Sequence, residues 1–151
     1  MDSSVVRAVV EKEIEPLMER LGIGHWSVSV GYEPHTSGDP DRIPGGRCTP
    51  LVDYDSARIV LNPEAFDGQD EVCKTLRHEL FHLVVSPFRV YMHAVRASLP
   101  DGSPLVAVLD EVWIHADERA VKNLERMYFG LTRKPEPKPK AKKKKRSRCR
   151  A

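Results

Sequence analysis

The stretch His-Glu-Leu-Phe-His at residues 78–82 is the most informative part of this chain. On a helix, His78 and His82 lie about one turn apart, so both imidazoles project from one face and can bind one metal ion. Glu79 lies beside that position, where a carboxylate can take a proton from metal-bound water. The spacing therefore predicts a hydrolytic site with Zn²⁺ as the cofactor and Glu79 as the catalytic residue.

The sequence around this motif predicts a helix. Residues 70–85 contain neither Gly nor Pro, and the pair Ser86-Pro87 is expected to end or kink the helix. Apolar residues recur at helical spacing and form the expected buried stripe: Val72, Leu76, Leu80 and Leu83. The two histidines fall on another side of the helix, as expected for the wall of a cleft. The alternative is a pair of unrelated histidines that happen to have this spacing.

The remaining segments predict an α+β domain over residues 1–132. Its expected parts are an N-terminal helix, a small and mostly antiparallel sheet, the motif helix and a long C-terminal helix, which together form a zincin-like metal cleft. The expected segments are a helix at 4–21, strands at 25–32, 49–54 and 57–61, a loop at 34–50, and helices at 88–97 and 105–129, the last ending at Gly130.

A catalytic zinc site needs a third protein ligand, and the long helix offers the candidates. Asp117 falls within the apolar stripe of that helix, and Glu118 falls at its edge. Because a buried, unpaired carboxylate is costly, each of the two acids favours a metal or a positive partner. The alternative for both is a surface charge on an Arg-rich helix. The choice between the two acids stays open at this point.

The chain resembles the gluzincin metallopeptidases, especially small single-domain HExxH proteins of bacterial and phage origin. Besides the motif at 78–82, the resemblance rests on the pattern Glu-x-x-apolar-x-x-apolar in the later helix, which here reads Glu118-Arg119-Ala120-Val121-Lys122-Asn123-Leu124. It implies a metalloendopeptidase that acts on a protein or peptide substrate, with zinc held by His78, His82 and Glu118 and with Glu79 as general base. It also implies that strand 57–61 is an edge strand that aligns an extended peptide.

The chain departs from the gluzincin pattern in two respects. Asp117 stands next to Glu118, which leaves the position of the third ligand open by one residue. The Tyr or His that polarises the substrate in larger gluzincins has no assigned position, and the candidates are Tyr91, His93 and His115.

Two other functions compete with this interpretation. In the first, His93 is the third ligand, as in SprT-like proteases that act on DNA-bound proteins. In the second, the chain is a non-catalytic, zinc-stabilised binding module associated with nucleic acid. Glu79 distinguishes the second alternative from an enzyme, because a structural zinc site has no use for a general base.

The end of the chain differs in composition from the rest. Eleven of the 24 Lys and Arg residues but only one of the 22 acids follow residue 132, so the tail at 133–151 carries about +10 and the preceding body about −8. With three alternating Pro residues and almost nothing apolar to bury, the tail is expected to be disordered. Its basic run is the expected contact for nucleic acid or another polyanion: Lys142, Lys143, Lys144, Lys145 and Arg146. The alternative is a solubilising appendage.

Composition also predicts where the protein resides. No apolar run approaches the roughly 20 residues that cross a bilayer, and the acid-rich N-terminus does not resemble a signal peptide. The three cysteines are odd in number and widely spaced, which favours a reducing compartment. We therefore expect a cytoplasmic protein with no membrane partner.

Overall fold

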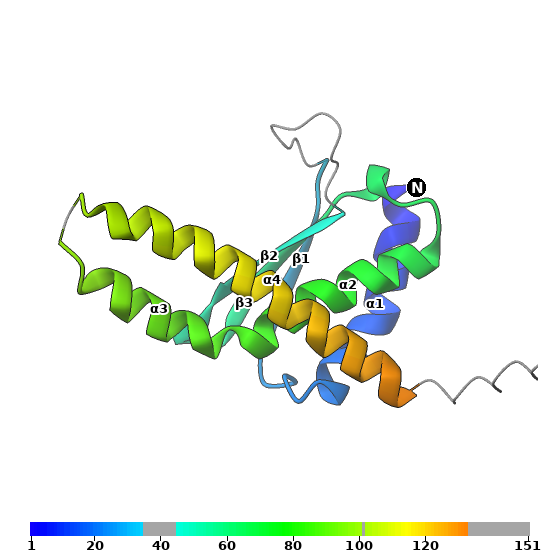
Figure 1. The fold of residues 1–151 in the computed structure, drawn as a ribbon. Coiled ribbons are helices and arrows are strands. Elements are labelled where there is room, and N and C mark those ends of the chain that lie inside the picture. The colour runs from blue at the N-terminus through cyan, green and yellow to red at the C-terminus, as the bar shows by residue number, and fades with distance from the viewer. Residues whose placement is uncertain (35–44, 101, 133–151) are drawn as a thin grey trace, which may run out of the picture.

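The computed structural model describes residues 1–34, 45–100 and 102–132, which form four α-helices and a three-stranded mixed sheet (Figure 1). In chain order the helices and strands are α1 (Ser3–Arg20), β1 (Ser27–Tyr32), β2 (Gly46–Leu51), β3 (Ser56–Leu61), α2 (Gln69–Val85), α3 (Pro87–Ala97) and α4 (Pro104–Thr132). The predicted α+β class is confirmed at this level. The predicted tail at 133–151, with its basic run Lys142–Arg146, lies outside the described residues, as do residues 35–44 of the predicted loop.

The sheet has the strand order β1-β3-β2, and its two pairings run in different directions. Strand β1 is parallel to β3, with Val30 opposite Ile59, whereas β2 is antiparallel to β3, with Cys48 opposite the same Ile59. The prediction of a mostly antiparallel sheet is therefore wrong. Alternating apolar residues indicate a strand but carry no information about the direction of its neighbour.

Strand β3 occupies the centre of the sheet, and β2 lies at an edge of the three described strands. The expectation that strand 57–61 is an edge strand is therefore wrong. The expected loop at 34–50 and strand at 49–54 are corrected as well, because the strand spans Gly46–Leu51 and a 3₁₀ turn follows at Val52–Tyr54. The sequence of β2, with one Gly and one Pro, has a weak strand signal, and its pairing with β3 sets its extent.

The core lies where α1 and α2 pack against the sheet. Alternate residues of β3 are buried, and they share one apolar cluster with both helices: Ala57, Ile59, Leu61, Val6, Val10, Val72, Leu76 and Leu80. The stripe predicted on the motif helix is therefore confirmed. Since burial of each large apolar side chain stabilises a fold by about 1.5–3 kcal/mol, this stripe fixes the rotation of α2 and the direction of its histidines.

Helices α3 and α4 form a hairpin whose closed end lies away from the sheet and from α1 (Figure 1). Ser86 ends α2 and Pro87 starts α3, as the sequence predicted. The second half of α4 packs back against α2, where Val121 is completely buried with Phe81 and Val85.

The end of α4 differs from the prediction, because the helix continues past Gly130 to Thr132. A single Gly costs a helix about 1 kcal/mol relative to Ala, which is too little to end a helix whose preceding turns pack against a neighbour. Among the described helices, none combines the length and the apolar composition needed to cross a membrane.

Candidate metal centre

The histidines of the motif face α4. With the apolar stripe of α2 turned toward the core, His78 and His82 lie on the flank that the second half of α4 covers. The side chain of His82 is only 9% exposed and that of His78 is 24% exposed. The two rings stand edge to face, with centroids 5.1 Å apart. The pair therefore lies between two helices, on a side of α2 other than its buried stripe, as the helical wheel predicted.

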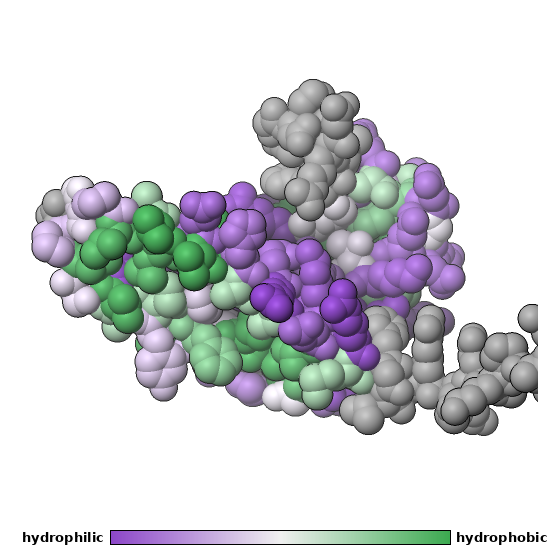
Figure 2. Space-filling view, viewed as in Figure 1, coloured by the Kyte–Doolittle hydropathy of each residue, from purple (hydrophilic) through white to green (hydrophobic). Residues whose placement is uncertain are grey.

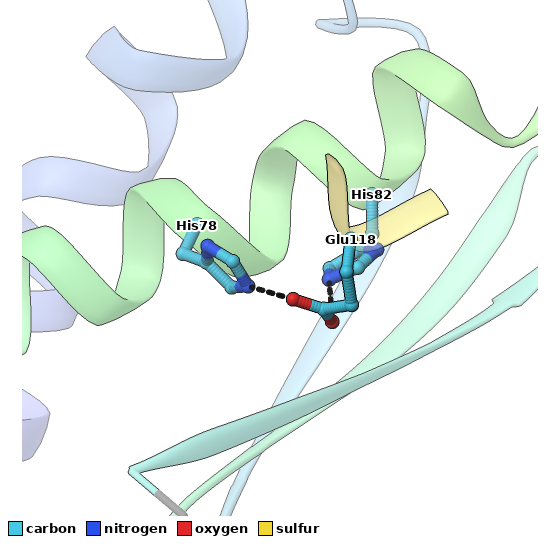
Figure 3. Close-up of side chains that lie close together, drawn as sticks. All are labelled: His78, His82 and Glu118. Carbon is cyan, nitrogen blue, oxygen red and sulfur yellow. Dashed lines mark ion pairs between the residues drawn. The ribbon is translucent and has the colours of Figure 1, made fainter. Parts of the chain in front are cut away.

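Helix α4 brings Glu118 to this pair. The Glu118 oxygens lie 3.7 Å from Nε2 of His78 and 3.5 Å from Nε2 of His82. Each of the three residues offers one ligand atom, and these atoms all lie within 4.8 Å of one another (Figure 3). Two imidazole nitrogens and a carboxylate oxygen are a donor set that Zn²⁺ uses in proteins. The carboxylate of Glu118 is 42% exposed and also lies 3.6 Å from Nζ of Lys122.

Asp117 lies on the other side of the His82 ring from Glu118. Its Oδ2 is 3.0 Å from Nδ1 of His82 and also accepts a hydrogen bond from Arg89, at 2.9 Å. A carboxylate can only accept, so Nδ1 of His82 carries a proton, and whenever the ring is neutral Nε2 has a lone pair on the side of Glu118. This is the arrangement that commonly orients a metal-binding histidine. Glu118 thus belongs to the group that could hold a metal ion, and Asp117 lies behind His82.

A second carboxylate lies behind His78. Oε2 of Glu125 is 3.4 Å from Nδ1 of His78, so each histidine has one acid at Nε2 and another at Nδ1. The sequence interpretation missed both Glu125 and Arg89. For Glu125 a signal existed, since it follows Glu118 by two helical turns on the same face of α4. Arg89 had no comparable signal, because its contact with Asp117 depends on the turn between α2 and α3.

Glu79 is buried between α2 and β2, with 5% of its surface exposed. Its carboxylate accepts a hydrogen bond from the backbone of Cys48. A Cβ atom built on Gly46 would lie 3.0 Å from Oε1 of Glu79, so the strand backbone approaches this side chain closely. Burial raises the pKa of Glu79 and outweighs the opposing effect of the two histidines. The chain thus places a desolvated carboxylate next to the histidine pair and beside the edge strand.

The electrostatics of His82 and Asp117 are coupled. Burial alone would lower the pKa of His82, but the hydrogen bond to Asp117 and the charges of Glu79 and Glu118 outweigh it and raise that pKa. Burial alone would raise the pKa of Asp117, but the hydrogen bond with His82 and the charge of Arg89 lower it. Both shifts favour a protonated His82 ring beside an ionised Asp117 carboxylate. A bound divalent ion supplies the same kind of partner for the surrounding carboxylates.

The other predicted site residues lie elsewhere. His93 and Tyr91 are exposed on α3, His115 is exposed on α4, and none of them joins the group around Glu118. The polyanion-binding residues Lys142–Arg146 lie outside the part of the chain that the structure describes. The structure thus brings together four of the expected residues, His78, Glu79, His82 and Glu118, with Asp117 directly behind them.

Comparison of the chain with protein-family models, with curated proteins and with solved structures gave no match.

Proposed function

We propose that this protein is a zinc-dependent peptidase whose site lies between α2, α4 and β2. The observation that carries the proposal is the close approach of His78, His82 and Glu118, with the buried carboxylate of Glu79 beside them. When bound, zinc would supply a Lewis acid that polarises the peptide carbonyl and makes water a nucleophile near neutral pH.

The donor set supports a catalytic site more than a structural one. A structural zinc ion is normally closed by four protein ligands, whereas a catalytic ion keeps one position for water or substrate. The described residues offer three ligands in this group and no fourth. Cys48, which could have closed the set as a thiolate, is not part of the group, and its thiol pKa is raised to about 12, chiefly by burial.

The position of Glu79 fits the role of general base. In the proposed reaction Glu79 takes a proton from the attacking water and passes it to the leaving nitrogen as the peptide bond breaks. The edge strand β2 gives a path for the substrate, because an extended peptide that pairs with β2 would pass directly beside Glu79. In this proposal β2 replaces the strand at 57–61 as the element that aligns the substrate, and the space between β2, α2 and α4 is the zincin-like cleft.

Glu79→Gln tests the proposal. The variant is expected to bind zinc as the wild type does and to lose peptide hydrolysis by at least about 100-fold, because the amide cannot act as a base. The measurement is cleavage of a fluorogenic peptide library by zinc-loaded protein, alongside zinc content by elemental analysis. Glu71→Gln, an exposed change on the same helix, is the matched control and should retain full activity.

Two results would contradict the proposal. The first is a Glu79→Gln variant that cleaves as fast as the wild type, and the second is a zinc-loaded wild type that cleaves no peptide of the library. Zinc binding without hydrolysis would favour the non-catalytic binding module. The SprT-like alternative would require His93 to move from its exposed position on α3 to the group around Glu118.

A further inference from the structure

The turn between α2 and α3 holds the start of α3 in a defined position. Ser86 is completely buried, and its Oγ donates a hydrogen bond to the carbonyl oxygen of Leu83 at 2.7 Å. The carbonyl oxygen of Ser86 in turn accepts a hydrogen bond from the backbone N–H of Arg89 at 2.8 Å. Pro87, at the first position of the helix, presets the backbone angle that a helix needs. Arg89 is therefore carried on a well-defined backbone, about one turn beyond the end of the motif helix.

Asp117 is the one charged residue of α4 that is buried, among those the structure describes. On the face that Figure 2 shows, hydrophilic residues gather over the second half of this helix, where they meet solvent. The side chain of Asp117 is instead turned inward and is only 7% exposed. Its Oδ2 accepts hydrogen bonds from Nδ1 of His82 at 3.0 Å and from Arg89 at 2.9 Å. Since its Oδ1 has no hydrogen-bond partner among the described residues, these two donors determine the direction of the carboxylate.

Arg89 supplies the fixed positive charge beside this carboxylate. Its Nε atom is buried, so the guanidinium group reaches into the protein although no residue of α3 is buried as a whole. Among the described Lys and Arg residues, only Arg89 forms an ion pair with Asp117. Removing one partner of a buried ion pair is unfavourable, because an uncompensated charge stays behind. Without Arg89, Asp117 would therefore gain free energy by turning toward solvent, away from the ring of His82.

The direction of Asp117 sets the direction of the His82 ring. Because Nδ1 faces Asp117, Nε2 on the opposite side of the ring faces Glu118, at 3.5 Å. An imidazole binds a metal ion along the lone pair of one nitrogen, and the hydrogen bond at its other nitrogen fixes the orientation of the ring. Three helices thus act on one candidate ligand: α2 carries His82, α4 contacts its Nδ1, and α3 holds the carboxylate that makes this contact.

We propose that Arg89 is a positioning residue of the metal centre, which acts through Asp117 to hold His82 in the orientation that binds zinc. The inference rests on the proposed function, because it concerns the same metal centre. It makes zinc affinity depend on α3, although no residue of α3 belongs to the group of potential ligands.

A second Arg–Asp pair provides a matched control. Arg96 of α3 pairs with Asp110 of α4 at 3.2 Å, so it links the same two helices by the same kind of contact. The side chains of Arg96 and Asp110 are 51% and 44% exposed, and neither residue belongs to the metal-binding group. Loss of this pair should loosen α3 without changing the direction of His82. The comparison therefore separates a positioning role of Arg89 from a role in the packing of α3 alone.

The test is the zinc affinity of the full chain, measured by competition with a chromogenic chelator. Arg89→Met is expected to lower the affinity by about tenfold or more, the usual effect of changing a group that orients a ligand. Arg96→Met should leave the affinity unchanged. Arg89→Lys, which retains the charge, should recover part of the loss. Arg89→Gln, which retains a hydrogen-bond donor, is measured as well so that the test does not depend on the folding of one variant.

A double-mutant cycle shows whether Arg89 acts through Asp117. In an Asp117→Asn background, Arg89→Met should have little further effect on zinc affinity, because both changes act on the same contact. Circular dichroism of the zinc-free proteins checks that every variant folds.

Three results would overturn the inference. In the first, Arg89→Met and Arg89→Gln bind zinc as tightly as the wild type. In the second, Arg96→Met loses as much affinity as Arg89→Met, which would limit Arg89 to the packing of α3. In the third, Arg89→Met has its full effect in the Asp117→Asn background. A wild type that binds no zinc would overturn both this inference and the proposed function, whereas a wild type that binds zinc but cleaves no peptide would contradict the peptidase alone.

Discussion

At the scale of single residues, the neighbouring acids Asp117 and Glu118 contact different nitrogen atoms of the histidine pair. The Glu118 carboxylate lies near the Nε2 atoms of both histidines. Asp117 accepts hydrogen bonds from Nδ1 of His82 and from Arg89. Ligands and the groups behind them contribute to metal affinity in different degrees. The two acids can therefore be distinguished by substitution.

Glu118→Ala is expected to remove most zinc affinity, because it deletes a proposed zinc ligand. Asp117→Asn should lower the affinity by about 10–100-fold, the usual effect of changing a group that orients a ligand. The measurement is a competition titration against a chromogenic zinc chelator, with Asp110→Asn on the same helix as the control. The assignment of Glu118 is wrong if its variant binds zinc normally while Asp117→Asn does not bind it.

Cys48 offers a separate prediction at this scale. Burial, followed by the charge of Glu79, raises its thiol pKa from 9.0 to about 12. At pH 8 this lowers the fraction of reactive thiolate by about 1,000-fold relative to a thiol of pKa 9.0. In a background where Cys73 and Cys149 are changed to Ser, native protein should react with iodoacetamide far more slowly than urea-unfolded protein. Equal rates in the two states would contradict the burial of this thiol.

At the scale of elements, the site depends on how closely β2 approaches α2. A Cβ atom at Gly46 would lie 2.9 Å from Cγ2 of Thr75 and 3.0 Å from Oε1 of Glu79. A contact of Cβ under 3.0 Å forces neighbouring atoms to move. Here the neighbours are the side chains of Thr75 and Glu79, which belong to the helix that carries the motif. Gly46 is therefore needed for its lack of a side chain rather than for an unusual backbone conformation.

Gly46→Ala is expected to destabilise the protein by about 1–3 kcal/mol, the usual cost of overpacking. It should also lower peptide hydrolysis, because the added methyl group displaces Glu79. Gly31→Ala in β1 is the matched control, since a Cβ there meets its nearest neighbour at an ordinary 3.6 Å. Urea unfolding monitored by Trp fluorescence measures the free energy of unfolding. Equal values for the two variants would mean that β2 and α2 are farther apart than described.

At the scale of the whole molecule, the chain separates charge along its length. The body up to residue 132 is acidic, and the following 19 residues are strongly basic. Within the body, acids gather around the histidines, and the hairpin carries opposite charges on its two helices. A polyanion would therefore be repelled by the body and attracted by the tail.

Deletion of residues 133–151 is expected to weaken binding to duplex DNA or RNA and to flatten its dependence on salt, because fewer counterions are released. Zinc content should not change, since the proposed metal centre lies in the body. The measurement is fluorescence anisotropy over a series of salt concentrations, with a full-length control in which residues 142–146 are all Ser. An unchanged binding isotherm after deletion would limit the tail to a role in solubility.

Much of the fold and of the site was predictable from local patterns. A buried stripe at helical spacing predicted α2, the Ser86-Pro87 pair predicted its end, and the motif predicted the histidine pair. These features depend on residues within one or two turns of each other. The direction of β1, the extent of β2 and the end of α4 depend on distant neighbours, and the sequence interpretation missed them.

Local sequence is enough to predict that one helix carries His78, Glu79 and His82 within about one turn, because helical spacing is a local property of the backbone. The packing of α4 against α2 sets how its two acids meet the histidines: Asp117 contacts Nδ1 of His82, and Glu118 lies near the Nε2 atoms of both rings. Asp117 and Glu118 are neighbours that point about 100° apart around a helix. Their directions are fixed by the burial of Val121 against Phe81 and Val85, which no local pattern contains. Contacts between elements far apart in the chain therefore distinguish the candidate ligand from the residue behind it.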